Sequence, residues 1–347
     1  MMRRNICYLV AAIVALLGLA CSRPNQKEYV TSDGQMLGTF VRVTACTDRP
    51  VGEIFDQMMQ LDTEAKQSMS IFEKNSLLSR LNRNETDSLD EHITFCLNRA
   101  RQMTQISGGY YDVTVAPLVE AYGFAGKDRS TEINVDSLME FVGIDKLQIE
   151  KNRLIKSDPR VRIDFNSIAK GYVVDLAAER LRQMGAEDFL VDIGGEVRCQ
   201  GRNPKGGAWR VGIETPIDGS AEVGANIQQI ISLTDCAMAT SGNYRRFYID
   251  AQGRKVAHTI DPRTGKSAVT DLLSATVIAP TCTDADALGT MFMAMGTERA
   301  IELAKALQPQ GVMVYFIANG EGDDFKIYYS SSLAPMLNTT KGFHAIK

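Results

Sequence analysis

The segment 258–265, His-Thr-Ile-Asp-Pro-Arg-Thr-Gly, brings an imidazole, a carboxylate, a guanidinium and two hydroxyls into one short stretch. Pro262 and Gly265 indicate a turn rather than the interior of a helix or strand. The chain has three histidines, at positions 92, 258 and 344. A histidine in a polar loop beside an arginine, which pairs well with phosphate, suggests chemistry on a phosphorylated substrate. An Asp-Pro-x-x-Gly surface turn with an incidental histidine explains the segment equally well.

A second group of polar side chains lies in an apolar segment near residue 290. Asp286 and Thr290 are four residues apart, so an α-helix would place them on one face, with Asp284 shortly before. A carboxylate and a hydroxyl, completed by backbone carbonyls and waters, form an oxygen set that suits Mg²⁺. Capping of the helix by Thr283 or Asp284, with Thr290 bonded to its own turn, accounts for the same residues without a metal.

Residues 164–171, Asp-Phe-Asn-Ser-Ile-Ala-Lys-Gly, are expected where a strand meets a helix. A strand-to-helix turn points free backbone N–H groups at an anion, and Lys170 adds a positive charge in the first helical turn. The alternative is that Asp164 or Asn166 caps the helix while Lys170 is solvated. The glycine pattern of a P-loop is absent here.

Three further turns contain glycines that would let the chain pass close to a ligand. In residues 107–112, Ser-Gly-Gly-Tyr-Tyr-Asp, the side chains of Tyr110 and Tyr111 could flank a planar ring. Gly194-Gly195-Glu196 follows a buried strand, where paired glycines also occur in ordinary bulges. Residues 241–245, Ser-Gly-Asn-Tyr-Arg, form a polar loop. Each of these turns is also explained by chain geometry alone.

Hydrophobic periodicity predicts helices and strands that mix without strict alternation. The expected helices are 51–66, 91–106, 167–184, 284–295 and 297–307, and the expected strands are 37–44, 161–165, 189–193, 209–213, 247–249, 274–278, 311–317 and 325–329. This order favours an α+β fold of mixed sheets packed with helices over a doubly wound sheet. With no repeat and no strong linker, residues 34–347 are predicted to form a single compact catalytic unit.

The N-terminal residues have the pattern of an export signal. Arg3 and Arg4 precede the apolar run 6–19, which is short for a membrane span. Small residues then lead to Cys21 and a polar stretch, which resembles a bacterial lipoprotein signal. We therefore expect a signal peptide over residues 1–20, a lipidated Cys21 and a tether over residues 21–33. An ordinary N-terminal membrane anchor is the alternative. Lipidation would place the protein on a membrane in the cell envelope, outside the cytoplasm.

Composition excludes some classes of function. The whole chain has 38 basic and 42 acidic residues. Residues 1–20 contain two of the basic residues, Arg3 and Arg4, and no acidic one, so the remaining chain carries 36 basic and 42 acidic residues. A net charge of −6 argues against a nucleic-acid binder. If Cys21 carries lipid, five cysteines remain, at positions 46, 96, 199, 236 and 282, without CxxC spacing. A full disulfide framework or a zinc site is therefore not expected.

Taken together and in order, these motifs resemble the family of FAD:protein FMN transferases, the ApbE-like flavin transferases. The matching stretches are Leu37–Phe40, Ser70, Ser76–Asn82, Gly108–Thr114, Pro117–Leu118, Tyr122–Phe124, Asp164–Gly171, Asp175, Gly194–Gly195, Trp209–Glu214, Ser241–Tyr244, His258–Gly265 and Ala285–Thr290. The chain departs from the family pattern at three places. Leu37 stands where Met is usual, with Met36 one residue earlier; Tyr122 stands for Trp, and Phe72 for Tyr.

The resemblance implies Mg²⁺-dependent transfer of FMN from FAD to a threonine or serine hydroxyl of an acceptor protein, with release of AMP. Mn²⁺ would suit the same oxygen ligands. The implied acceptor is an exported or membrane-bound flavoprotein. The implied roles are a general base for His258, phosphate contacts for Arg263 and Lys170, Mg²⁺ ligands for Ser167, Asp286 and Thr290, and an FAD site lined by Met36, Leu37, Phe72, Tyr110, Tyr111, Asp112, Asp164 and His258.

Two other functions fit the same motifs. With water as the nucleophile, the site would be an FAD pyrophosphatase that gives FMN and AMP. A lipoprotein that binds flavin without turnover is the second alternative, although the presence of His258, Asp286 and Thr290 argues against it.

Overall fold

A computed structural model describes residues 27–126, 128–130, 132–218, 226–322 and 324–347. The expected signal peptide and Cys21 lie outside the described residues. Strand β1 begins at Glu28, so residues 28–33 of the expected tether are part of the folded body. Within the described part of the chain, no helix is long and apolar enough to cross a membrane.

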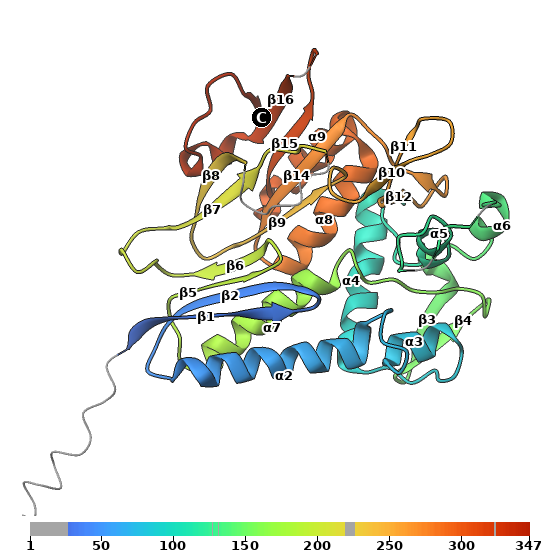
Figure 1. Ribbon diagram of the computed structural model, residues 1–347, viewed down its shortest axis with the longest axis horizontal. Coiled ribbons are helices and arrows are strands. Elements are labelled where there is room, and N and C mark those ends of the chain that lie inside the picture. The colour runs from blue at the N-terminus through green and yellow to red at the C-terminus, as the bar shows by residue number, and fades with distance from the viewer. Residues whose placement is uncertain (1–26, 127, 131, 219–225, 323) are drawn as a thin grey trace, which may run out of the picture.

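A nine-stranded sheet runs through the molecule (Figure 1). Its strands, in spatial order, are β1 (Glu28–Met36), β2 (Thr39–Thr47), β5 (Phe189–Ile193), β6 (Glu196–Gln200), β9 (Ala237–Gly242), β14 (Leu272–Ala279), β15 (Met313–Asn319), β16 (Phe325–Ser330) and β17 (His344–Ile346). All neighbours are antiparallel except β16 and β17, which are parallel. The expected α+β class with a mixed sheet is confirmed.

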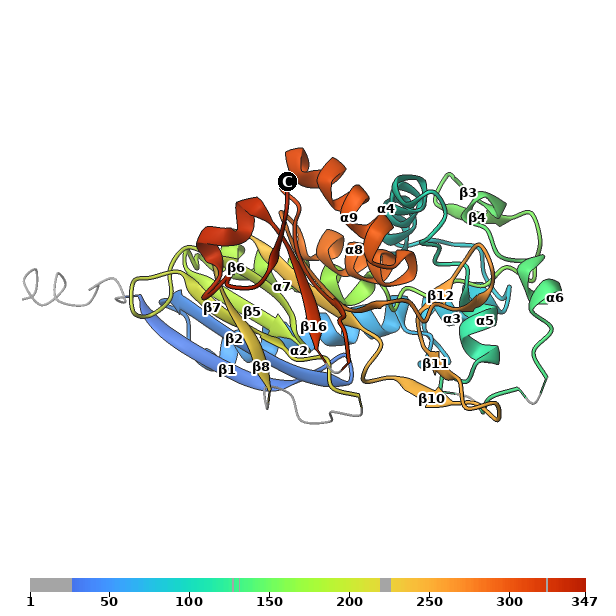
Figure 2. The same cartoon turned by 90° about the horizontal axis from the view of Figure 1, so that it is seen from above.

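Helices cover one face of this sheet, as the two views show (Figures 1 and 2). The helices are α2 (Val51–Met69), α3 (Leu77–Asn82), α4 (Glu91–Ser107), α5 (Ala116–Ala121), α6 (Val135–Met139), α7 (Ala169–Gln183), α8 (Cys282–Met295) and α9 (Thr297–Leu307). Helix α8 packs against β9 and β14, and α7 packs against β5 and β6. Because α7 and α8 also pack on each other, their N-terminal turns are brought together over the middle of the sheet.

Four two-stranded sheets lie outside the large one. They are β3 (Leu147–Glu150) with β4 (Arg153–Lys156), β7 (Trp209–Glu214) with β8 (Ile227–Leu233), β10 (Phe247–Ile249) with β11 (Lys255–Ala257), and β12 (Ile260–Asp261) with β13 (Lys266–Ser267). The pairs β10–β11 and β12–β13 fold the segment that carries His258 into a compact loop system beside the sheet.

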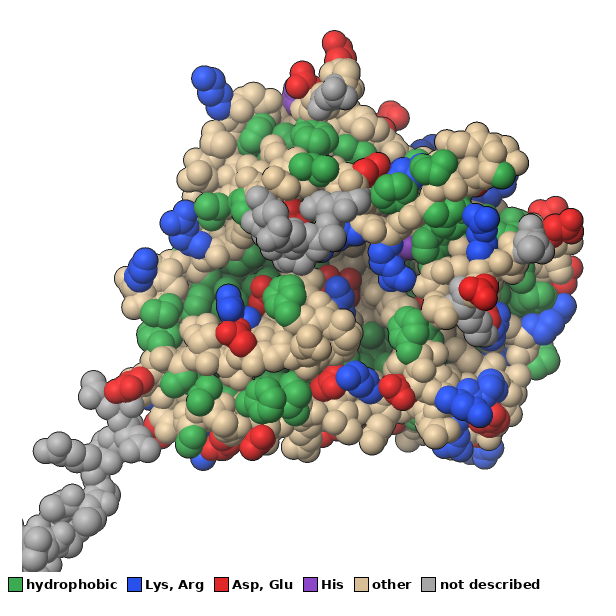
Figure 3. Space-filling view, viewed as in Figure 1, with side chains coloured by type: hydrophobic (Ala, Val, Ile, Leu, Met, Phe, Trp, Pro, Cys, Tyr) green, Lys and Arg blue, Asp and Glu red, His purple; other side chains and the backbone are tan. Residues whose placement is uncertain are grey.

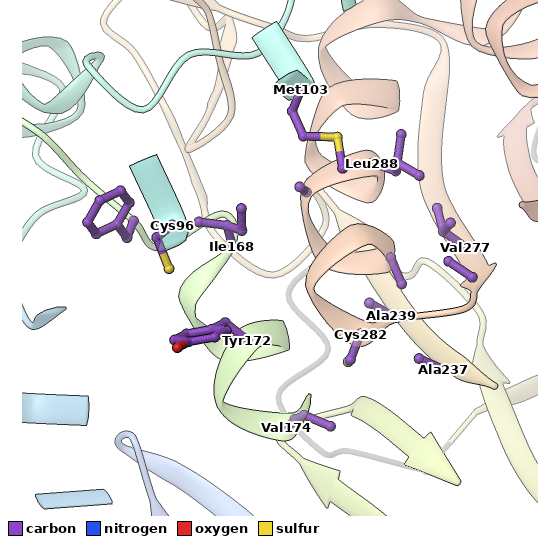
Figure 4. Packing of buried hydrophobic residues seen from close by; sticks show 14 of the residues in the cluster. Cys96, Met103, Ile168, Tyr172, Val174, Ala237, Ala239, Val277, Cys282 and Leu288 are labelled. Carbon is purple, nitrogen blue, oxygen red and sulfur yellow. The ribbon is translucent and has the colours of Figure 1, made fainter. Parts of the chain in front are cut away.

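The sheet separates two hydrophobic cores, since successive side chains of a strand point to opposite faces. Ala275 and Val277 of β14 belong to the core under the helices, whereas Ile278 belongs to the core under the β7–β8 hairpin. Figure 4 shows Cys96, Ile168, Tyr172 and other side chains of this core where α4, α7 and α8 meet. This packing makes α7 and α8 a rigid platform.

Several sequence predictions need correction. Residues 161–165 are not a strand, because only an isolated bridge joins Arg162 to Val115. The first strand pair is a hairpin over residues 28–47, not a single strand from residue 37. The last strand is not the predicted strand 325–329, because β17 follows it and pairs in parallel with β16. The other predicted helices and strands are confirmed, with shifts of a few residues at their ends.

Candidate active site

A cavity of about 430 Å³ lies where the β1–β2 turn, the N-terminal turns of α7 and α8, and the His258 loop meet. The face in Figure 3 is hollowed near its centre. Such a volume is typical of small-molecule sites. Eleven of the predicted site residues line the cavity, namely Leu37, Phe72, Tyr110, Tyr111, Asp112, Asp164, Ser167, Lys170, His258, Asp286 and Thr290.

The closest approach in the site is between α7 and α8 at Gly171. A Cβ atom added there would lie 2.3 Å from the carbonyl oxygen of Cys282, so no larger residue fits without moving a helix. The backbone N–H of Gly171 donates to a carboxylate oxygen of Asp286 at 2.9 Å. This N–H belongs to the first turn of α7, where backbone donors lack helical partners and favour a negative charge. The Asp286 carboxylate of the protein itself therefore binds at this helix start, where an anion was expected.

Two buried carboxylates, Asp286 and Glu196, lie beside the partly exposed ammonium group of Lys170. Lys170 Nζ lies 2.5 Å from Glu196, a carboxylate that is 5% exposed. Burial opposes the charged form of Lys170, but the neighbouring carboxylates outweigh it and raise its pKa. Burial also raises the pKa of Asp286, an effect that Lys170 and the Gly171 N–H oppose. Lys170 is therefore a held ammonium group at the cavity wall, not the solvated side chain of the alternative interpretation.

The residues expected to bind Mg²⁺ fit a hard cation in their chemistry. Asp286 and Thr290 lie one turn apart on α8, and Ser167 joins them in the cavity wall just before α7. Their donors are a carboxylate, a hydroxyl and a backbone carbonyl, which are the oxygen types that Mg²⁺ prefers. A cation would also favour the ionised form of Asp286 that burial disfavours. Among the described residues, no cluster of three or more His, Cys, Asp and Glu side chains forms a different metal site.

Asp284, the other carboxylate of this helix, has a different partner. Its Oδ1 accepts from Arg99 Nε of α4 at 2.6 Å, and the pair ties α8 to α4. The side chain that caps α8 is that of Thr281, which accepts from the Asp284 N–H. Asp284 is therefore a structural residue beside the site.

Asp175 of α7 holds the start of α8 from across the helix interface. Its carboxylate accepts from the Cys282 N–H at 2.9 Å, from the Thr283 N–H at 2.8 Å and from the Thr283 hydroxyl at 2.7 Å. It also pairs with Arg198 of β6 at 3.0 Å. Sequence reasoning placed Asp175 in a motif without a role. The structure shows that it joins the helix of Lys170 to the helix of Asp286.

His258 is held at the cavity wall by its own backbone and by Arg246. The backbone N–H of His258 donates to the Arg246 carbonyl at 3.2 Å, and the ring Nδ1 lies 3.3 Å from the same oxygen. Burial, reinforced by the Arg246 charge, lowers the pKa of His258 to about 4. The imidazole is thus neutral at neutral pH and has a ring nitrogen free to accept a proton. The next residue, Thr259, fixes the loop by donating to Asn243 at 2.8 Å.

Aromatic side chains form another part of the wall. Phe72 is 60% exposed, which is unusual for so large an apolar side chain. Phe124 stacks on Tyr248 with ring centroids 5.6 Å apart and meets the His258 ring edge-on at 6.2 Å. Tyr111 is almost fully buried, and its hydroxyl accepts from the Ser167 hydroxyl at 2.9 Å. Tyr111 therefore positions Ser167, while Phe72 and Phe124 are the more accessible rings.

Two of the predicted ligand residues use their carboxylates within the fold. Asp112 accepts from the backbone and hydroxyl of Thr114 and from the Ile144 N–H, and burial raises its pKa. Asp164 accepts from the Asn166 N–H at 2.8 Å, and burial raises its pKa as well. Both line the cavity, so they can contact a ligand only with the oxygen lone pairs that these bonds leave over.

Two predicted site residues do not line the cavity. Met36 is 1% exposed and lies in the main hydrophobic core, so Leu37 is the member of that pair at the cavity. Arg263 pairs with Asp261 at 3.2 Å, and its guanidinium lies 3.4 Å from the ring centre of Tyr110. The Arg263 guanidinium therefore stacks on Tyr110, which lines the cavity, while Arg263 itself does not line it. A phosphate contact would require its side chain to leave that ring.

Sequence reasoning assigned no role to three residues that the fold brings to the cavity. Arg246 donates to the Phe124 carbonyl at 2.8 Å and faces His258, and Glu196 pairs with Lys170. Glu196 had a signal, because it follows the paired glycines of the β5–β6 turn. Phe124 lay in a matching stretch without a role, whereas Arg246 had no signal, since its partner Phe124 is 122 positions away in sequence.

Residues 37–316 match the ApbE family. The chain belongs to the ApbE family. It is 34% identical over 341 residues to the FAD:protein FMN transferase of Vibrio cholerae serotype O1, covering 95% of this chain and 99% of that protein. It is 33% identical to the protein of the same name from Haemophilus influenzae, covering 98% of this chain and all of that protein.

Solved structures of ApbE proteins have the same fold. The flavin transferase ApbE from Vibrio cholerae superposes with a TM-score of 0.78 at 33% identity, covering 89% of this chain and 99% of that one. The apo flavinyl transferase ApbE from Pseudomonas stutzeri gives the same TM-score at 25% identity, covering 92% and 99%. The predicted family is therefore confirmed, and the cavity lies within the matched residues.

Proposed function

We propose that this protein transfers FMN from FAD to a threonine or serine hydroxyl of an acceptor protein and releases AMP. The observation that carries this proposal is that one cavity holds a neutral His258, a held Lys170 ammonium and the Asp286–Thr290 oxygen pair. Membership of a family whose relatives bear the name FAD:protein FMN transferase supports it.

In this reaction the acceptor oxygen attacks the phosphorus of the FMN half of FAD. The bond from that phosphorus to the bridging oxygen breaks, and AMP leaves with the bridging oxygen. His258 accepts the proton of the hydroxyl, which suits an imidazole that is neutral before the reaction. Lys170 supplies positive charge toward the phosphates from the cavity wall.

Asp286, Thr290 and the backbone oxygen of Ser167 would hold Mg²⁺, or Mn²⁺ in its place. The cation, when bound, neutralises charge on the pyrophosphate. The chain's own contribution is to hold the Asp286 carboxylate between the Gly171 N–H and the Lys170 ammonium group. Leu37, Phe72 and the tyrosine-lined wall would receive the flavin half of FAD.

We further propose that Cys21 is lipidated, which would anchor the protein to a membrane of the cell envelope near an exported or membrane-bound acceptor. The sequence pattern before Cys21 supports this proposal. Strand β1 begins at Glu28, only seven residues later. A tether of that length spans at most about 25 Å, so the catalytic body would stay close to the membrane surface.

The test incubates the detergent-solubilised full chain with FAD, Mg²⁺ and an exported flavoprotein domain that offers a threonine. Intact-mass spectrometry should find an FMN-sized addition to the acceptor that requires Mg²⁺, with one AMP released per adduct. Free FMN and AMP without an adduct would instead indicate an FAD pyrophosphatase. Bound FAD without turnover would indicate a flavin-binding protein. Either of these results would overturn the transferase proposal.

A further inference from the structure

Two cysteines outside the cavity lie next to each other, Cys199 in β6 and Cys236 at the position just before β9. Strand β6 pairs with β9 through Val197 with Met238 and Arg198 with Ala237. The next position in that register places Cys199 opposite Cys236. The Cys199 N–H donates to the Cys236 carbonyl at 2.9 Å, and the Cys199 sulfur lies 3.6 Å from the same oxygen.

The two side chains also share one face of the sheet. Cys199 belongs to the core under the β7–β8 hairpin, and Cys236 packs against that core. The Cys199 thiol points to Cys236, since its hydrogen-bond partner is the Cys236 carbonyl oxygen. Cys199 is buried, whereas Cys236 is partly exposed and so can be reached from outside. Backbone pairing and a shared sheet face bring the Cβ atoms of two opposite residues close to the separation that a disulfide requires.

We propose that Cys199 and Cys236 are a disulfide-forming pair, which a small-molecule or protein disulfide oxidises by thiol–disulfide exchange. The Cys236 thiolate attacks one sulfur of the oxidant, forms a mixed disulfide and releases one thiol, which takes up a proton. The Cys199 sulfur, losing its proton, then attacks the Cys236 sulfur and releases the second thiol. Two cysteine thiols are oxidised, and one oxidant disulfide is reduced to two thiols.

The order of attack follows from the exposure of the two thiols, because Cys199 is buried and Cys236 is partly exposed. The neighbouring Cys199 also lowers the pKa of Cys236, although burial opposes this. The neighbouring Cys236, together with burial, raises the pKa of Cys199. The partly exposed Cys236 is therefore the thiol that meets the oxidant, and Cys199 resolves the mixed disulfide from within.

The disulfide would link the two ends of an excursion, the segment 199–236, which leaves the large sheet and returns to it. Between Cys199 and Cys236 the chain leaves the large sheet, forms the β7–β8 hairpin and returns to β9. The hairpin covers the second core with Trp209, Ile231 and Leu233. A bond at the base of this excursion would hold the hairpin on the sheet and stabilise the fold mainly by restricting the unfolded chain.

The test treats the detergent-solubilised full chain with oxidised glutathione, alkylates the remaining thiols and digests the product with trypsin. Cleavage after Arg198, Arg202, Arg210 and Arg245 places Cys199 in peptide 199–202 and Cys236 in peptide 211–245. We expect these two peptides as one linked species that disappears on reduction. Alkylation of both peptides, or separate glutathione adducts without the link, would overturn the proposal.

Thermal unfolding provides a second measurement. We expect the melting temperature of the oxidised protein to exceed that of the reduced protein by about 5 °C. The difference should vanish in Cys236→Ser and persist in Cys46→Ser, a matched control because Cys46 is also a partly exposed strand cysteine. Equal melting temperatures of linked and reduced protein would refute the stabilising role of the bond.

Discussion

Replacing Asp175 by alanine should loosen the start of α8 without removing a side chain that lines the cavity. The substitution removes three hydrogen bonds of 2.7–2.9 Å to Cys282 and Thr283. Loss of a side-chain acceptor for the N–H groups at a helix start costs about 0.5–2 kcal/mol. Arg198, whose side chain is 15% exposed, also loses its ion-pair partner, and an unpaired, largely buried charge adds roughly 1–3 kcal/mol. We therefore expect Asp175→Ala to lower the free energy of unfolding by about 3 kcal/mol.

The conservative variant should separate shape from charge. Asp175→Asn keeps the size of the side chain and one acceptor oxygen, so a loss of about 1–2 kcal/mol is expected. Helix α8 itself should persist, because Thr281 still caps it. Glu179→Ala is the matched control, since Glu179 lies one turn further on α7 in an exposed pair with Arg182. That change should cost less than about 0.5 kcal/mol.

Urea unfolding of the three variants, followed by circular dichroism, measures these differences. Because α8 carries Asp286 and Thr290, Asp175→Ala should also raise the Mg²⁺ concentration needed for half-maximal activity more than Glu179→Ala does. An Asp175→Ala protein with the unfolding midpoint of the wild type would show that the carboxylate does not hold the two helices together.

Further predictions concern the cavity. His258→Ala should retain FAD binding but reduce transfer by ~10²–10⁴-fold; undiminished transfer would remove His258 from the mechanism. In an NMR titration, the His258 ring should gain its proton near pH 4, and a midpoint of 6–7 would contradict its burial. Mg²⁺ should raise the wild-type melting temperature but not that of Asp286→Asn, and an equal rise would reject the metal assignment. Phe72→Ala should weaken FAD binding by about 0.5–1.5 kcal/mol, with Phe72→Tyr near wild type; unchanged affinity in Phe72→Ala would remove the ring from the site.

The predictable part of the fold is the part that local patterns encode. Helix α4 ends at Ser107, one residue beyond the predicted end, and is followed by Gly108 in the left-handed conformation typical of a helix C-terminus. The four-residue spacing of Asp286 and Thr290 correctly placed both at one surface of α8. The strand expected over 161–165 is absent, although its apolar residues Val161, Ile163 and Phe165 are buried in the main core. Burial alone does not make a ladder of hydrogen bonds, and only Arg162 forms an isolated bridge.

The functional residues divide in the same way. The spacing rule could not tell that Asp284 turns to Arg99 while Asp286 turns to the cavity, because both are acidic residues of one helix turn. Nor could it choose between Met36 and Leu37. The hairpin turn sends the first into the core and the second to the cavity. Side-chain direction at such points depends on what packs against each element.

The order of motifs, the family, the α+β class and most residues that line the cavity could be predicted from the amino-acid sequence. Helix periodicity, glycine turns and motif spacing made this possible, because they are properties of neighbouring residues. Partners that are far apart in the sequence were not predictable, such as Asp175 with the start of α8, Lys170 with Glu196, and Cys199 with Cys236. Those pairs form only when sheets and helices pack together, and local residue patterns do not show which distant residues that packing brings into contact.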